Sequence, residues 1–119
     1  MRTLGRAAIA ALSLPAMCFA APEATWPVAG QQGIVRFVIV PADKAADERA
    51  YEEQIVRLCE PEASCFLNFY TNSTGVKPEV PLPDAIASEA TATYRRSLKN
   101  GVQLMTWSCR LKVPDRPCF

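Results

Sequence analysis

The chain has 119 residues, of which 50% are hydrophobic and 21% are charged, and it contains no histidine. The formal net charge of +1 gives no reason to expect a nucleic-acid partner, and the absence of histidine excludes serine–histidine and cysteine–histidine catalysis. This length accommodates one small domain, which gains noticeably from covalent cross-links.

Residues 1–20 have the pattern of a secretory signal peptide. Arg2 and Arg6 precede an apolar, alanine-rich stretch that ends in a small residue, Ala20. The stretch is shorter than the ~20 residues of a membrane-spanning helix, and Pro15 interrupts it. We therefore expect cleavage after Ala20, no membrane span in the mature chain, and a location in a bacterial periplasm or, alternatively, outside the cell.

After the signal peptide, residues 21–32 show no periodicity and predict a loose N-terminal arm. Residues 34–40 form a nearly continuous apolar, β-branched run that is typical of a central buried strand. A helix is predicted between Pro41 and Pro61, with Asp43 as its cap. Its buried stripe consists of Tyr51, Ile55, Leu58 and Cys59.

The second half of the chain repeats this alternation. Residues 65–70 predict an aromatic-rich second strand, and residues 72–83 a long turn. A second helix is expected from Pro83 or Asp84 to the stop signal at Asn100-Gly101. Residues 102–109 predict a third strand, followed by a basic tail, 110–119. The apolar stripe of this second helix would be Leu82, Ile86, Ala90, Tyr94 and Leu98.

The order strand, helix, strand, helix, strand predicts a small two-layer α/β sandwich formed by residues 33–119 as a single domain. We expect a three-stranded, mainly parallel sheet with both helices on one face. The other face would carry side chains such as Phe66, Tyr70 or Trp107 and be open to a partner, unless Trp26 folds over it.

The mature chain keeps four cysteines, and an even number in an exported protein indicates disulfides. Their spacing is wider than that of the paired ligands in a zinc site, so we expect no metal and no other cofactor. Cys59 and Cys65 would lie at one end of the sheet and Cys109 at the other, too far away to pair with Cys65. This predicts Cys59–Cys65 and Cys109–Cys118, as structural cross-links and not as a redox-active pair.

Charge is unevenly distributed, because residues 43–62 are mainly acidic and residues 95–116 mainly basic. We interpret both segments as solvated faces of neighbouring elements, with a basic patch that docks an acidic partner as the alternative. In our leading hypothesis the protein binds another macromolecule, with a protein as the expected partner and no nucleic acid. The candidate interface residues are Tyr70, Trp107, Arg95, Arg96, Lys99 and Arg110.

A second hypothesis is an enzyme or ligand site in the crevice at the carboxyl ends of the strands. It would use Asp43 or Glu79 as base and Arg110 to hold an anion. A third hypothesis is a purely structural component of the cell envelope. The candidate crevice residues are Asp43, Asn72, Ser73 and Thr74, which are otherwise explained as a helix cap and turn residues.

Overall fold

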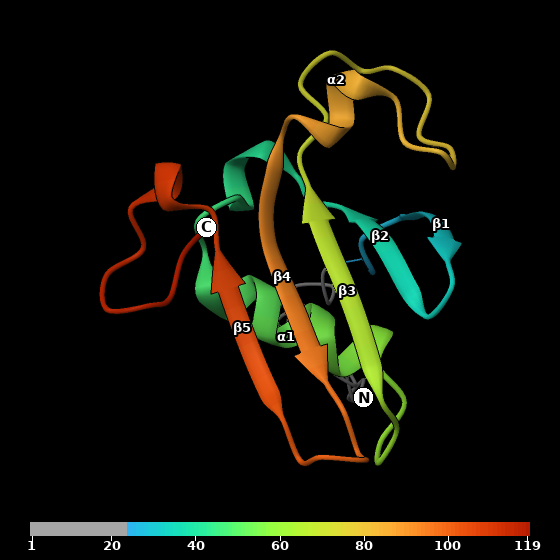
Figure 1. The fold of residues 1–119 in the computed structure, drawn as a ribbon. Helices are drawn as coiled ribbons and strands as arrows, with labels where there is room; N and C mark the ends of the chain where they lie inside the picture. The colour runs from blue at the N-terminus through green and yellow to red at the C-terminus, as the bar shows by residue number, and fades with distance from the viewer. Residues whose placement is uncertain (1–23) are drawn as a thin grey trace, which may run out of the picture.

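The computed structural model describes residues 24–119. The predicted signal peptide, residues 1–20, and the start of the predicted arm lie outside the described residues. Within 24–119, five strands form one sheet, accompanied by one long and one short α-helix (Figure 1). The elements are β1 (Val28–Gln32), β2 (Val35–Ile39), α1 (Glu48–Leu58), β3 (Cys65–Tyr70), α2 (Asp84–Ala87), β4 (Ala90–Arg96) and β5 (Gln103–Trp107), with 3-10 turns at Ala42–Lys44 and Cys109–Leu111.

The strands lie in the sheet in their order along the chain, β1-β2-β3-β4-β5. Of these neighbouring pairs β2 and β3 are parallel, joined by α1, and the others are antiparallel. The prediction of a three-stranded, mainly parallel sheet with two covering helices is therefore wrong. Its three strands do run in the same direction, but β4 lies between β3 and β5 and is antiparallel to both.

The main difference lies in residues 83–98, which were predicted to be a helix. This segment contains only the short helix α2, which is followed by β4. Ala92 and Tyr94 are buried whereas Thr93 and Arg95 are half-exposed, and this alternation has the period of a strand. Pairing with β3 on one side and β5 on the other satisfies the backbone of β4, so tertiary context overrides the helical spacing of its apolar residues.

A second difference is β1, which lies in the segment expected to be a loose arm. The chain turns at Gly33, whose φ of 61° suits glycine, and returns along β2 with Gln32 opposite Val35. The residues of β1 are glycine, glutamine, alanine and valine. Because glycine is depleted in strands, the local sequence gave little sign of this edge strand.

Helix α1 begins later than its predicted cap. Asp47 is the N-cap, and its Oδ1 accepts a hydrogen bond of 3.2 Å from the backbone N–H of Ala50. Asp43 instead lies in the 3-10 turn Ala42–Lys44, so the prediction of Asp43 as the cap is wrong. The helix ends at Leu58, ahead of Pro61, as predicted.

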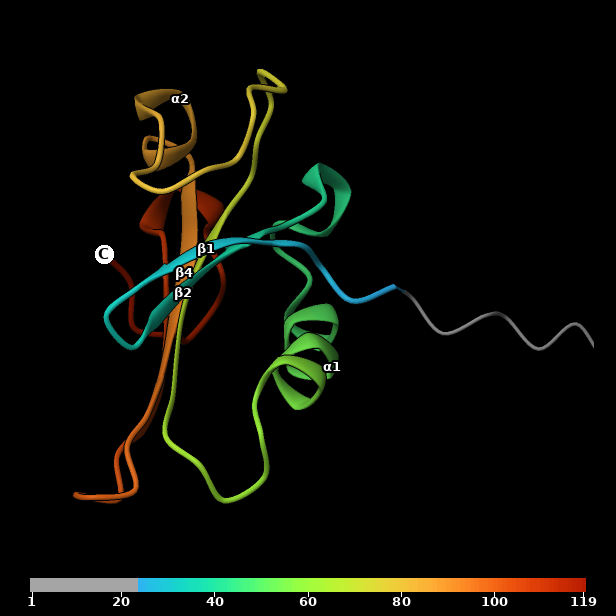
Figure 2. The same ribbon diagram turned by 90° about the vertical axis from the view of Figure 1, so that its right-hand side faces the viewer.

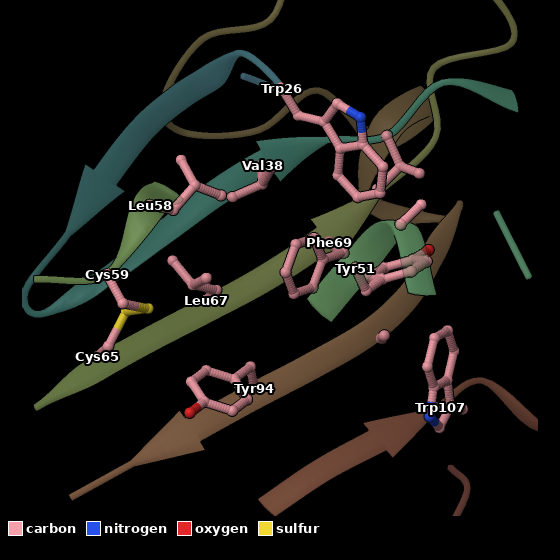
Figure 3. Packing of buried hydrophobic residues seen from close by; sticks show 13 residues of the cluster. Trp26, Val38, Tyr51, Leu58, Cys59, Cys65, Leu67, Phe69, Tyr94 and Trp107 are labelled. Carbon is pink, nitrogen blue, oxygen red and sulfur yellow. A yellow bond between two sulfur atoms is a disulfide. The ribbon is translucent and has the colours of Figure 1, made fainter. Parts of the chain in front are cut away.

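The core lies between α1 and one face of the sheet, with the ring of Tyr51 at its centre (Figure 3). The centroid of this ring lies 5.1 Å from that of Trp26, 4.9 Å from that of Phe69 and 4.6 Å from that of Trp107, each pair in an edge-to-face arrangement. One helical residue thus joins the N-terminal segment, the central strand and the last strand.

Two polar groups of α1 are buried with this core. The Tyr51 hydroxyl donates to the carbonyl of Ala45 and shares a second hydrogen bond with the hydroxyl of Thr91, both at 2.8 Å. Burial raises the pKa of Tyr51 to about 12. Gln54, which is fully buried, accepts a hydrogen bond of 2.8 Å from the backbone N–H of Trp26. The bond from Trp26 to Gln54 fixes the N-terminal segment over the helix.

Both predicted disulfides are present, with Cα separations of 5.7 Å for Cys59–Cys65 and 4.9 Å for Cys109–Cys118. They are compatible with an exported protein. The second disulfide holds the tail beside the end of β5, where the N–H of Trp107 donates to the carbonyl of Pro117 at 3.0 Å. In the part of the chain that the structure describes, no helix is both long and apolar enough to cross a membrane.

Candidate functional site

The face of the sheet opposite α1 carries two partly exposed aromatic side chains, Phe66 and Tyr70, and the basic side chain of Arg95. Figure 2 shows α1 to one side of the sheet and α2 beyond its upper end, which leaves this face of β3, β4 and β5 uncovered by a helix of the described residues. We call it the sheet face. The strand register brings one row of side chains together across it, formed by Val35, Phe66, Arg95 and Leu104, and a second row formed by Phe37, Asn68, Thr93 and Thr106.

Arg95 is held rigidly at the middle of the sheet face. One guanidinium nitrogen donates to the carbonyls of Leu67 and Tyr94 at 3.1 and 2.9 Å, and the other donates to Oδ1 of Asn68 at 2.7 Å. The guanidinium carbon lies 5.5 Å from the ring centroid of Phe66, a cation–π distance. Partial burial lowers the pKa of Arg95, which nonetheless stays charged at neutral pH.

The loop before α2 covers the end of this face near β1. A Cβ atom on Gly30 would collide with Cγ2 of Val80, so the loop packs directly on the β1–β2 hairpin. Phe37 is accordingly buried, and its ring lies 6.0 Å from that of Tyr70. The accessible part of the sheet face therefore extends from Tyr70 to Leu104, which is 46% exposed.

The predicted interface residues fall into different places. Tyr70 and Arg95 share the sheet face, where Asn68 contacts both. Trp107 lies on the helix-facing side and is only 3% exposed, so it belongs to the core. Arg96 donates to the carbonyls of Ala63 and Glu60 and thereby holds the disulfide loop.

The two remaining cations lie away from these residues. Lys99 is exposed in the turn between β4 and β5. Arg110 donates to the carbonyls of Glu89 and Ala90 at 3.2 and 3.1 Å. The six predicted interface residues therefore do not form one patch, and Tyr70 with Arg95 is the pair that the fold brings together.

The predicted crevice residues serve the turn in which they occur. The carboxylate of Glu89 accepts hydrogen bonds from the Ser73 hydroxyl and backbone N–H and from the Thr71 hydroxyl, and these bonds lower its pKa. Asn72 donates to the carbonyl of Val76 and accepts from the hydroxyl of Thr74. These polar groups are engaged with one another, as in a structural turn.

Asp43, the fourth predicted crevice residue, lies in a different place. It lines a shallow depression beside Trp26 and Lys44 on the 3-10 turn. The depression is not lined by Asn72, Ser73 or Thr74. The structure therefore does not gather the four residues around one site.

A larger hollow, of about 670 Å³, runs between α1 and β5 on the other side of the sheet. Ile55 and Val56 of the helix form one wall, and Tyr94, Met105 and Trp107 form the floor. At one end an ion pair of 3.2 Å between Arg116 and Glu48 closes it, and the hydrogen bond in this pair raises the pKa of Arg116. We call this hollow the α1–β5 groove. Its walls and floor are mostly apolar.

Within residues 24–119 no group of three or more cysteine, aspartate and glutamate residues is placed to hold a metal ion. Comparisons with protein-family models, with curated proteins and with solved structures find no match. The sheet face and the α1–β5 groove are the two candidate functional surfaces of the described residues.

Sequence reasoning anticipated Phe66 and Tyr70 on an open face, but it missed Asn68, Leu104 and the groove. Residues 65–70 are apolar except for Asn68, so this asparagine was the one sequence signal for the face on which Phe66, Asn68 and Tyr70 are half-exposed. The groove had no such signal, because it depends on the insertion of β4 beside β3.

Proposed function

We propose that the protein is an exported interaction module that binds another protein through its sheet face. A bacterial periplasm is the location that we favour, with secretion as the alternative. Two disulfides in a domain of this size support an oxidising compartment, and the predicted signal peptide supports export.

The observation that carries the proposal is the cluster of Phe66, Arg95 and Leu104 in one row across the uncovered strands. Aromatic and arginine side chains are enriched at the centres of protein interfaces, where they contribute most of the binding energy. Hydrogen bonds already fix the guanidinium of Arg95, so little conformational entropy is lost when a partner covers it.

A protein partner fits this face better than a nucleic acid does. The chain is close to electrically neutral, and nucleic-acid binding draws most of its affinity from many phosphate contacts. The basic side chains of Arg96 and Arg110 donate to backbone carbonyls elsewhere and do not extend the cluster. A mainly apolar patch with a single central cation is instead suited to a partner that presents apolar side chains and one acceptor.

The experiment is site-specific photo-crosslinking in the host that makes the protein. A benzophenone amino acid replaces Tyr70 on the sheet face in one variant and Val56 beside the α1–β5 groove in another. We expect one discrete adduct from the Tyr70 position, identifiable by mass spectrometry, and its loss when Leu104→Ser is added. A Tyr70 variant that is folded and oxidised but forms no adduct, or an adduct that Leu104→Ser leaves unchanged, would refute the proposal.

The alternative of a site in the predicted crevice receives no support, because Glu89 and Val76 engage the polar groups of Asn72 and Ser73. The alternative of a purely structural envelope component predicts no discrete adduct from either crosslinking position. The same experiment therefore separates it from an interaction module.

A further inference from the structure

The outer edge of β5 is uncovered for most of its length (Figure 1). The N–H and C=O groups of Trp107 point away from β4 and bond to Pro117 and Phe119 in the tail. Because these directions alternate along an antiparallel strand, the N–H and C=O groups of Met105 and Gln103 also point away from β4. In the described residues no strand pairs with them.

This edge lacks the usual protection against strand pairing. Sheet edges are commonly guarded by charged residues, proline or a bulge, and β5 has the sequence Gln-Leu-Met-Thr-Trp without any of these. The opposite edge strand, β1, has a bulge between Val28 and Gly30. The tail blocks β5 only at Trp107, so an accessible segment remains.

The α1–β5 groove lies on the side of the sheet to which Met105 points. In a strand added beside β5, alternate side chains would project to that same side and enter the groove. Its apolar wall, which includes Ile55 and the 78% exposed Val56, matches aliphatic side chains. Free backbone groups along an edge and an adjacent apolar groove are the two components of peptide recognition by strand addition.

We propose that the edge of β5 and the α1–β5 groove together bind an extended segment of a partner protein with aliphatic side chains at alternate positions. The position of the tail is evidence for an extended segment as the occupant, because Cys118 already pairs in parallel with Trp107 on the same edge. An added strand would continue the line of the tail toward Gln103. This surface is separate from the sheet face, so the inference goes beyond the proposed function and stands or falls without it.

The test uses a fluorescent synthetic peptide of about nine residues, within the usual length of a strand, with leucine at every second position and serine, threonine or lysine between. The control peptide has proline at the intervening positions, which removes their N–H donors. Fluorescence anisotropy with the oxidised protein measures both affinities. We expect binding of the first peptide and about tenfold weaker or no binding of the second, since each lost main-chain bond weakens it.

Two variants of Gln103 separate the backbone from the side chain. Gln103→Pro removes an N–H that points away from β4, so the β4–β5 ladder keeps its bonds, whereas Gln103→Ala keeps that N–H. We expect the proline variant to weaken peptide binding about fivefold or more, as the loss of one hydrogen bond implies, and the alanine variant to have little effect.

A second pair of variants tests the groove without altering the strand. Val56→Lys places a charge at its wall, and Ile34→Lys makes a matched change at another exposed apolar residue, 66% exposed in the β1–β2 turn. We expect weaker binding for Val56→Lys and unchanged binding for Ile34→Lys. Circular dichroism and the disulfide content confirm that each variant is folded.

Equal binding of the two peptides, or equal effects of Gln103→Pro and Gln103→Ala, would overturn the inference. Equal effects of Val56→Lys and Ile34→Lys would also overturn the inference, because they would show that the α1–β5 groove does not contact the peptide. Light scattering on the protein alone tests the other occupant: a dimer that Gln103→Pro dissociates would assign the edge to a second copy of the chain and reject the peptide.

Discussion

Replacement of Tyr51 by phenylalanine removes one hydroxyl group from the centre of the core and leaves the ring. The hydroxyl bonds to the Ala45 carbonyl and to the Thr91 hydroxyl at 2.8 Å each, in a position where Tyr51 is only 1% exposed. Buried hydrogen bonds contribute about 1 kcal/mol each, so we expect Tyr51→Phe to lower the free energy of unfolding by about 2 kcal/mol at pH 7.

The same hydroxyl makes this difference depend on pH. Burial raises the pKa of Tyr51 to about 12 in the folded protein, whereas an unfolded tyrosine titrates near 10. Between these values the unfolded state binds fewer protons, so the stability of the unsubstituted protein falls as pH rises. The loss amounts to about 1.4 kcal/mol by pH 11 and approaches roughly 2.7 kcal/mol above pH 12.

Urea unfolding of both proteins at pH 7 and pH 11, followed by tryptophan fluorescence, measures the two differences. All other titrating groups are common to the pair, so their contributions cancel. We expect the difference in free energy of unfolding to shrink from about 2 kcal/mol to below 1 kcal/mol at the higher pH. A difference that is small at pH 7, or that stays constant between the two pH values, would refute the assignment of a buried, doubly bonded hydroxyl to Tyr51.

Three further changes test the fold. Asp47→Ala should lower the free energy of unfolding by about 1 kcal/mol, because it removes the N-cap of α1. The control substitution Asp43→Ala should have a much smaller effect. Equal effects of the two substitutions in urea unfolding would contradict Asp47 as the cap. Gly30→Ala should lower the free energy of unfolding by about 1 to 3 kcal/mol, because the added methyl group collides with Val80. The second substitution Val80→Ala should restore most of this free energy, and a double-mutant cycle measures the coupling between the two positions. Replacement of Cys109 and Cys118 by alanine should lower the free energy of unfolding by about 2 to 3 kcal/mol and increase hydrogen exchange at Trp107, and an unchanged midpoint would count against a structural role for this disulfide.

The elements that the sequence predicted well are those whose local pattern and tertiary environment agree. Residues 65–70 were predicted as a strand and form β3, because burial on the α1 side selects Leu67 and Phe69 while the intervening residues face outward. The disulfides were predicted correctly because β3 and β5 do run in the same direction, which places Cys65 and Cys109 at opposite ends of the sheet. That conclusion survived even though the strand between them was missed.

The elements that sequence analysis missed are those whose secondary structure depends on pairing with distant strands. Ile86, Ala90 and Tyr94 have helical spacing by coincidence, and the sequence alone could not reveal that β3 and β5 both pair with this segment. Once β4 is a strand, the side of the sheet to which each residue of β5 points is set by register. Trp107 therefore lies in the core and Leu104 on the sheet face, a separation that no count of apolar residues predicts.

The four strand pairings differ in how far apart along the chain their partners lie. The β1–β2 and β4–β5 pairs join strands that follow each other through a turn, such as Gln32 with Val35 and Arg96 with Gln103. The β2–β3 and β3–β4 pairs instead join distant residues, such as Val35 with Phe66 and Cys65 with Arg96, and pairing of this kind forms more slowly because the loop between the partners must close first. We therefore expect the two hairpins to form first and to meet around Tyr51, with Trp26 beside one and Trp107 in the other completing its surroundings.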